Sequence, residues 1–552
     1  MSTLDWIVLC STLGFITIYG IIKSRGKSNL TDYILGDQKA VWWKVGFTVM
    51  ATQASAITFI STTGQGYSDG LKFIQFYFGL PLAMLVICIT FIPIFYKLKV
   101  YTAYEFLEKR FDIKTRTLTA SLFLIQRGIA AGLTLYAPSI ILSTVFNWNL
   151  QLTHVISGLL VILYTVGGGA KAVTATQLQQ LAVIFIGMFF IFFFLIYSFP
   201  QEVSFPEIWT LAGWSNKMDA IDLSLNFNDR YNIWAGITGG FFLALSYFGT
   251  DQSQVQRYLS GKNIHESRLG LIMNGILKIP MQFFILSCGV LLFSYFQFQK
   301  TPIHFNQRVE KEIAIQHPAK YQIWNDQLNL LHEDRIEQLS KNTWDPGFLK
   351  QNNSNVQEIH QEVREFVKTN LPKHESNDKD YIFLYFILNY LPHGTIGLLI
   401  AVILCAAMSS ISAELNALSG TTTVDIYKRF FAKNESNDDI SRSRWFTVMW
   451  GLVAISFAMY ASLFENLIQF INIVGSLFYG TVLGIFLVAF YIKRVQGNAV
   501  FIAALIAQGF TFYLYNFSGI GFLWYNVIAC FNVVVLSLIL QWYENNKKPS
   551  LS

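Results

Sequence analysis

Two segments of the chain carry small and hydroxyl-bearing residues within otherwise apolar sequence, a combination that could hold a small cation. One segment, Ala406-Ala-Met-Ser-Ser410, contains two adjacent hydroxyls. The other contains Ala51, Ala54, Ser55 and Thr58. Sodium is a hard cation that prefers oxygen ligands such as carbonyls and hydroxyls. We therefore predict that each segment contributes part of the ligands of one sodium site.

The segment around Ala54 is expected to unwind in its middle, because it is rich in small residues and is followed by Gly64 and Gly66. In a bilayer, carbonyls freed by unwinding are tolerated only where they line a cavity or hold an ion. The predicted sodium ligands are the carbonyls of Ala51, Ala54 and Ala406 and the hydroxyls of Ser409 and Ser410. Close helix packing, which also favours small residues and serine, is the alternative interpretation.

The composition indicates an integral membrane protein, with 53% hydrophobic, 16% aromatic and only 13% charged residues. About 20 apolar residues are needed for each helical crossing, and a bilayer leaves helices as the plausible structure here. The sequence therefore predicts an all-α membrane protein with about 13 transmembrane helices. The apolar runs are 6–22, 42–63, 73–96, 118–146, 155–166, 178–199, 233–248, 269–296, 396–418, 445–463, 471–492, 499–515 and 522–542.

Basic residues between the runs predict the orientation. Arg25 and Lys27 follow the first run, and Lys97, Lys109 and Arg110 follow the third. Because basic loops are retained on the cytoplasmic side, we expect the N-terminus outside and the C-terminus inside a cell membrane. These loops also account for the formal net charge of +6, so no nucleic-acid partner is expected.

A polar segment, 300–380, interrupts the apolar pattern and divides the chain into 1–299, 300–380 and 381–552. The span count places it on the extracytoplasmic side. An amphipathic helix is predicted by the spacing of Val356, Ile359, Val363, Phe366 and Val367. Five of the eight histidines lie in this segment, but their spacing is unlike that of a metal site and they are interpreted as solvated.

Enzymatic and ATP-driven functions lack support in the sequence. It contains no HExxH, GxSxG or P-loop pattern, which are the motifs that would hold a catalytic zinc, a nucleophilic serine or a nucleotide phosphate. The prediction is therefore a protein that is neither an enzyme nor a primary pump.

Several motifs, in this order along nearly the whole chain, resemble those of the sodium:solute symporter family, which includes sodium/glucose, sialic acid, iodide and monocarboxylate cotransporters. The resemblance implies a five-plus-five inverted-repeat core of the leucine-transporter type that works by alternating access. The motifs are Trp42-Trp43, Gly64-Gln-Gly-Tyr67, Tyr104-Glu-Phe-Leu-Glu-Lys-Arg-Phe111, Tyr136-Ala-Pro138, Gly167-Gly-Gly-Ala-Lys-Ala-Val173, Asp251-Gln-Ser-Gln-Val-Gln-Arg257, and Ala406-Ala-Met-Ser-Ser410 through Asp425-Ile-Tyr427.

The resemblance places the five predicted sodium ligands on the family's principal sodium site and implies Na+ as the coupling ion. Some members have a second site with an Asp where this chain has Gln177. A neutral amide binds sodium more weakly than a carboxylate, so one sodium per cycle is expected.

The solute is predicted to be a small organic anion, similar to sialic acid or a monocarboxylate. Arg127 is an ionisable residue within an apolar run and has the shape for bidentate carboxylate binding. Sialic acid symporters resemble this chain in directing an Arg, and hydroxyls at the positions of Ser55 and Thr58, at the substrate carboxylate. A structural Arg paired with another carboxylate remains an alternative.

A neutral sugar or polyol is the alternative solute. Lys278 matches a sugar-contacting Lys, and Asn472 stands where sugar transporters carry Gln, whereas Thr58 and Tyr77 replace their Gln and Glu. Tyr77 and Tyr247 are expected to form lids on the site, with Tyr247 matching the family's inner gate. A membrane sensor with a transporter-like fold is the alternative of another class, and the oligomeric state is left open.

Overall fold

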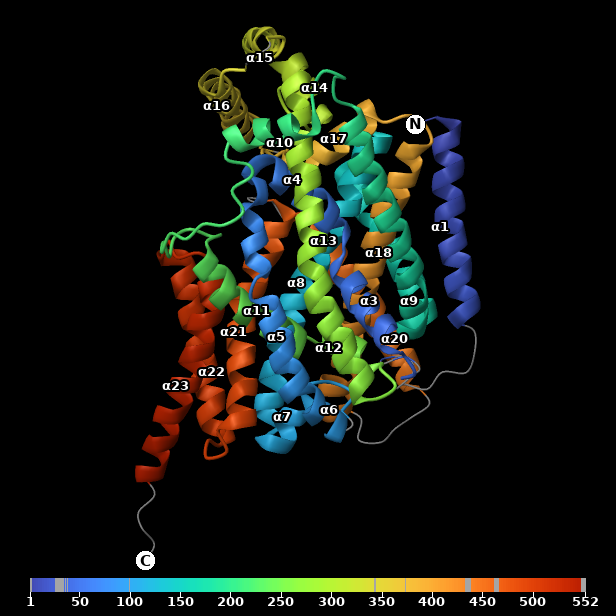
Figure 1. Cartoon of the computed structure of the whole chain (residues 1–552). Coiled ribbons are helices and arrows are strands. Elements are labelled where there is room, and N and C mark those ends of the chain that lie inside the picture. The colour runs from blue at the N-terminus through green and yellow to red at the C-terminus, as the bar shows by residue number, and fades with distance from the viewer. Residues whose placement is uncertain are drawn as a thin grey trace, which may run out of the picture.

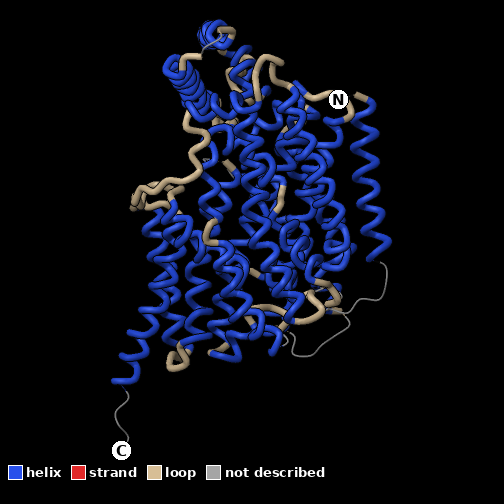
Figure 2. Tube along the Cα trace, viewed as in Figure 1, coloured by secondary structure: helices blue, strands red, loops and turns tan. Residues whose placement is uncertain are grey.

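The computed structural model of the protein describes residues 2–24, 34, 36, 38–98, 100–341, 344–372, 374–431, 438–460 and 466–547. Arg25 and Lys27, which were used to predict the orientation, lie outside the described residues. Most side chains of the Gly167–Val173 motif lie outside them as well. The described residues form helices joined by loops (Figure 2), with one isolated bridge between Ala40 and Gly261. The all-α prediction is confirmed.

The first half of the helical order is α1 (Thr3–Ser24), α3 (Trp42–Gln53), α4 (Ala56–Asp69), η1 (Gly70–Tyr77), α5 (Leu80–Val86), η2 (Ile87–Phe91), α6 (Ile92–Leu98), α7 (Glu105–Arg110), α8 (Ile113–Phe146), α9 (Leu150–Tyr197), α10 (Phe205–Trp214), η3 (Ala235–Gly239), α11 (Gly240–Thr250), α12 (Gln252–Leu259) and α13 (Ile264–Phe298). The second half is α14 (Gln307–Gln316), α15 (Pro318–Leu339), α16 (Pro346–Asn370), η4 (Lys379–Tyr381), α17 (Ile382–Tyr390), α18 (Thr395–Thr421), η5 (Thr422–Tyr427), α19 (Lys428–Phe430), α20 (Asp439–Tyr460), α21 (Leu467–Tyr491), α22 (Gly497–Phe517) and α23 (Leu523–Lys547).

The predicted apolar runs fall mainly within helices over their described residues. Nine helical stretches in the described part of the chain are long and apolar enough to cross a bilayer. The other four predicted runs fall in α1, in α3 with α4, in η3 with α11, and in α20, which are shorter, interrupted or more polar. Interruption matters here, because a broken helix exposes backbone groups that must find partners inside the protein.

The helices that carry the motifs form the centre of the molecule. Helices α3 and α4 both pack against α13 and α18, and α4 also packs against α8 and α21. Helix α1 lies at one edge of the bundle and α23 at the opposite edge (Figure 1). The central packing requires close approach: a Cβ at Gly66 on α4 would lie 2.4 Å from the carbonyl O of Leu286 on α13.

The polar segment forms three helices, α14, α15 and α16, at the end of the molecule that carries the N-terminus (Figure 1). They have their own apolar cluster, which includes Val363 and Val367 of the predicted amphipathic helix together with Trp324 and Leu328 of α15. The interpretation of the segment's histidines as solvated is wrong for His304 and His360. These two side chains are 0% and 7% exposed, because the helices fold over them.

Candidate sodium and solute site

The membrane helix that contains Ala51 and Ala54 is broken where α3 ends and α4 begins. Ala54 (φ −78°, ψ 68°) and Ser55 (φ −82°, ψ 171°) have non-helical backbone angles. Among the described residues, the backbone hydrogen bonds around the break leave the carbonyls of Ala51 and Ala54 without an amide donor. The predicted unwinding is confirmed, and it frees two oxygens in the bundle centre.

Helix α18 faces this break with its two adjacent serines. The Ser410 hydroxyl donates to the carbonyl of Thr52 at 3.1 Å, so α18 and α3 are in direct polar contact. The Ser409 hydroxyl is buried and has no hydrogen-bond partner among the described residues. Unsatisfied buried polar atoms are rare and call for a ligand or a water. This set of carbonyl and hydroxyl oxygens fits the donors that sodium prefers.

Gln177 lies next to the same break. Its Nε2 donates to the Thr52 hydroxyl at 3.1 Å, and its buried Oε1 has no partner among the described residues. The amide nitrogen of Gln177 is therefore hydrogen-bonded to α3, and its amide oxygen is not.

A cavity of about 870 Å³, solvent at its mouth included, lies beside the break. Six of the seven predicted solute residues line it. They are Ser55, Thr58, Tyr77, Tyr247, Lys278 and Asn472. Ser410 and Thr52 also line the cavity, so the predicted sodium and solute residues adjoin one another.

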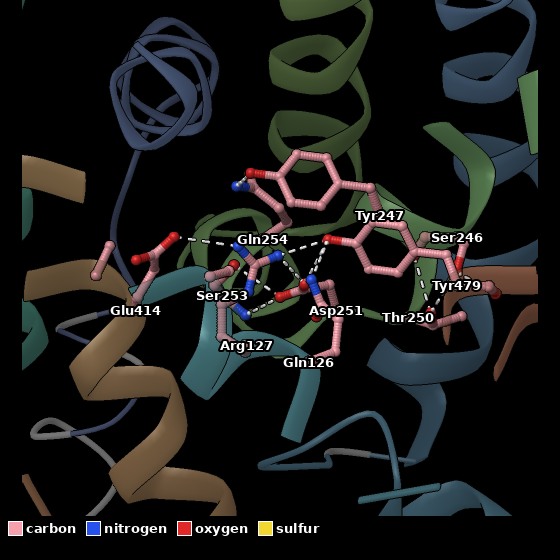
Figure 3. Close-up of polar contacts among 12 residues, drawn as sticks. Gln126, Arg127, Ser246, Tyr247, Thr250, Asp251, Ser253, Gln254, Glu414 and Tyr479 are labelled. Atoms are coloured by element: carbon pink, nitrogen blue, oxygen red, sulfur yellow. Dashed lines mark hydrogen bonds and ion pairs between the residues drawn. The ribbon is translucent and has the colours of Figure 1, made fainter. Parts of the chain in front are cut away.

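Arg127, the seventh predicted solute residue, is not among the cavity-lining residues. It is buried in a network (Figure 3) in which it forms ion pairs with Asp251 and, at 3.1 Å, with Glu414. It also donates to the hydroxyl of Tyr479 at 2.7 Å, and its guanidinium lies 5.3 Å from the ring centroid of Tyr247. The structure thus matches the alternative in which the Arg pairs with carboxylates of the protein.

This network lies next to Tyr247 and joins four parts of the bundle. Arg127 comes from α8, Asp251 from the break between α11 and α12, Glu414 from α18 and Tyr479 from α21. Asp251 also caps α12, accepting from the Ser253 amide at 2.9 Å. A buried charge is stable only when it is paired and hydrogen-bonded, so these four elements hold one another while the network is intact.

Lys278 is the cation that faces the cavity. It lies on α13, its side chain is 2% exposed, and its Nζ lies 5.7 Å from the ring centroid of Tyr77. No carboxylate of the described residues lies within ion-pair distance of it. Asn472 adds a buried amide nitrogen without a partner among those residues. The cavity therefore presents a lysine side chain without an ion-pair partner among the described residues, together with unfilled hydrogen-bonding groups.

Sequence reasoning missed three residues that shape this site: Glu414, Thr134 and Tyr479. Glu414 lines the cavity, and its Oε1 also accepts from the Thr134 hydroxyl at 3.4 Å. A signal for Glu414 was present, because it is an acidic residue in an apolar helix, one turn beyond Ser410. Tyr479 gave no such signal, since an aromatic residue in a membrane helix is ordinarily a packing residue.

Comparison with known proteins agrees with this architecture. The model of the Sodium:solute symporter family matches residues 33–316 and 365–507. The chain is 24% identical to a sodium/sialic acid symporter of Aliivibrio fischeri over 99% of this chain and 94% of that protein. It is 25% identical to a sodium/glucose cotransporter of Vibrio parahaemolyticus over 93% of this chain and 85% of that protein.

A solved structure of a sodium-coupled sialic acid symporter, substrate-bound and outward-open, has the same fold. It superposes with a TM-score of 0.76, at 22% identity, over 98% of both chains. The predicted leucine-transporter-type fold is confirmed. The chain belongs to the sodium:solute symporter family, and it is therefore a multi-pass membrane transporter that couples a solute to sodium rather than an enzyme.

Proposed function

We propose that this protein imports a small organic anion together with one sodium ion across the cell membrane, with its N-terminus outside and its C-terminus in the cytoplasm. The observation that carries the proposal is Lys278, a buried cation that faces the cavity with no carboxylate of the described residues beside it. A carboxylate of the solute would give Lys278 a partner in direct contact.

The charges around the cavity favour an anion over a neutral solute. If all four groups are ionised, Arg127 and Lys278 balance Asp251 and Glu414. Sodium alone would add one positive charge to this buried region, whereas sodium with a monoanion would leave the balance unchanged. Uncompensated buried charge is costly, so the second case is the more stable loaded state.

Sodium would be held by the carbonyls of Ala51, Ala54 and Ala406 and the hydroxyls of Ser409 and Ser410. The Ser410–Thr52 contact supports this assignment, because it brings α18 against the broken helix. Sodium bound there would stabilise the arrangement of Ser55 and Thr58 beside the cavity. The coupling then comes from a difference in sodium affinity between conformations.

Arg127 is engaged by two acidic residues, so a direct contact with a solute carboxylate would require Asp251 or Glu414 to leave it. We therefore assign the first contact with the anion to Lys278, with Ser55, Thr58 and Asn472 as hydrogen-bonding groups. Tyr77 and Tyr247, which both line the cavity, would cover the solute.

A neutral sugar or polyol is the second candidate solute. Two observations favour it: Lys278 and Asn472, which correspond to sugar-contacting positions, both line the cavity, and Glu414 presents a carboxylate that could accept from hydroxyl groups.

Thermal stability of the detergent-purified protein distinguishes the two solutes, because a ligand that binds the folded state raises its stability. The panel contains sialic acid, lactate and glucose, each in sodium and in potassium. Our proposal predicts a shift with an acid in sodium only. A shift with glucose alone would establish the second candidate, and no shift in either salt would contradict both.

A further inference from the structure

A second pocket lies between the polar helices and the membrane bundle. The polar helices lie at the end of the molecule that carries the N-terminus (Figure 1). Its walls come from the end of α4, the end of α13, α15 and α16, and it shares no lining residue with the solute cavity. Residues 317–364, which contain α15 and most of α16, are the internal segment that the family match leaves out. This pocket is therefore built in part by a segment that the family model does not cover.

Arg335 of α15 is the central group of this pocket. Its side chain is 2% exposed, and among the described residues the guanidinium donates hydrogen bonds to two amide oxygens, those of Gln297 at 3.4 Å and Asn353 at 3.3 Å. Its Nε is buried and has no partner among the described residues. Burial lowers the pKa of Arg335 to about 10, so the side chain remains charged at neutral pH. A buried guanidinium with neutral partners lacks a counter-ion.

The other charged groups around the pocket are already balanced. Arg364 pairs with Asp378 at 2.8 Å, and Lys379 pairs with Asp69 at 3.5 Å. Arg335 therefore carries the excess positive charge.

Histidine adds no charge that changes this balance. His360 lines the pocket, and burial lowers its pKa to about 4, so it is neutral at neutral pH. Its Nε2 lies 3.0 Å from the carbonyl of Pro302.

The remaining polar lining is rich in groups that can donate and accept hydrogen bonds. Amide side chains come from Gln297, Asn353, Gln357 and Gln361, and Thr301 adds a hydroxyl. A fork of guanidinium donors suits the two oxygens of a carboxylate, and the amides suit hydroxyl or amide groups on the same molecule.

We infer that this pocket is a second, peripheral binding site for a small hydroxylated carboxylate, with Arg335 as its counter-ion. None of the predicted sodium ligands lines it, so binding here is independent of sodium. The site lies on the predicted outer side, where it holds the anion near the transporter before or without transport. This inference does not require the bound anion to be the transported solute.

The test is equilibrium binding of radiolabelled sialic acid to the purified full-length protein in potassium without sodium, where the solute cavity lacks its coupling ion. We expect saturable binding that weakens at least tenfold in Arg335→Gln and is largely kept in Arg335→Lys. Gln357 is exposed at the pocket, so Gln357→Glu places a repelling charge there without disturbing the core, and it should weaken binding several-fold. Gln351→Glu, an exposed change on the same helix outside the pocket, should have no effect.

Competition separates the chemical classes of ligand. Unlabelled lactate or gluconate should displace the probe, whereas glucose should not. Displacement by sulfate but by no carboxylate would overturn the assignment to an organic acid. The inference is also overturned if no binding occurs without sodium, or if Arg335→Gln and Gln357→Glu both bind as the unaltered protein does. Sodium-dependent stabilisation at the solute cavity is measured separately on the same variants, so loss of one site is not mistaken for loss of the other.

Discussion

The Ser410 hydroxyl on α18 lies 3.1 Å from the carbonyl oxygen of Thr52 at the end of α3, and this contact joins the two elements that carry the proposed sodium ligands. The hydroxyl of the neighbouring Ser409 is buried and has no hydrogen-bond partner among the described residues. A helix pair that only packed together would not need an unsatisfied hydroxyl beside it, because such a group carries a desolvation cost. The unpartnered Ser409 hydroxyl therefore supports the proposed sodium site.

Replacing either serine should weaken sodium activation of uptake. Ser409→Ala removes a hydroxyl that has no protein hydrogen bond, so we expect stability without sodium to be unchanged and the half-activating sodium concentration to rise about tenfold, equivalent to ~1.4 kcal/mol. Ser410→Ala should have the same effect and also reduce stability. The matched control is Ser419→Ala, which changes a buried serine on the same helix whose hydroxyl donates to the Asn416 carbonyl. Unchanged sodium activation in both variants would contradict the assignment.

Lys278→Met should impair uptake of an organic anion by lowering the affinity of the protein for that anion. The substitution removes the charge and keeps a similar length, so a solute carboxylate would lose its counter-ion in a buried site. We expect KM for the anion to rise at least tenfold with a smaller change in the maximal rate. Lys350→Met, which removes an exposed lysine on α16, is the control. An unaltered KM for the anion would remove the main support for the proposed solute class.

Arg127→Gln should destabilise the protein more than it changes solute choice. It leaves Asp251 and Glu414 buried together without their cation, and breaking a buried ion pair costs about 3–5 kcal/mol. Adding Glu414→Gln to the same chain should recover part of the loss, because one of the two carboxylates is then neutral. Thermal unfolding of the two variants and of Arg127→Lys checks this. Normal stability with selective loss of anion binding would instead establish Arg127 as a solute ligand.

Two acidic groups near η4 should make stability fall as pH rises. Burial raises the pKa of Glu375, which accepts from Tyr381 at 2.8 Å, to about 7, and that of Asp380 to about 6. Between their ordinary values, 4.5 and 3.8, and these raised values, the folded state holds more protons than the unfolded state. Raising the pH through this window therefore costs stability.

Glu375→Gln isolates this effect, because it removes one titrating group and leaves His360, whose lowered pKa acts in the opposite direction below about pH 6.5. Relative to the unaltered protein, the variant should gain about 1–3 kcal/mol in unfolding free energy between pH 5 and pH 8. Glu362→Gln, on the exposed side of α16, is the matched control. A constant difference for Glu375→Gln would mean that its carboxyl titrates normally in the folded protein.

Two features of the fold were predictable from the sequence: the membrane spans, from apolar composition, and the break in the helix at Ala54, from small residues. The break at Ala54 followed from a run of small and hydroxyl residues, and the spans followed from apolar length alone. The partners of Arg127 were not predictable, because Asp251 and Glu414 lie 124 and 287 residues away along the chain. Which residue faces the cavity, Arg127 or Lys278, depends on the rotation of α8 and α13 in the bundle. The apolar sequence of a membrane helix specifies that rotation poorly, since lipid-facing and core-facing sides are both apolar.

The polar segment shows the opposite case. The spacing of Val356, Val363 and Val367 predicted α16 correctly, because a helix outside the membrane must separate its apolar and polar sides. The burial of His360 and Arg335 could not be predicted in this way, since it results from the insert folding onto the ends of α4 and α13.

Uptake into proteoliposomes tests the central claim most directly. Labelled sialic acid, lactate and glucose are each offered to vesicles containing the purified protein, with an inward sodium gradient or with equal potassium on both sides. Our account predicts that an organic acid accumulates above its external concentration only with the sodium gradient, and that Ser409→Ala and Lys278→Met each reduce this accumulation. Accumulation of glucose alone, or acid uptake that is the same in sodium and in potassium, would contradict it.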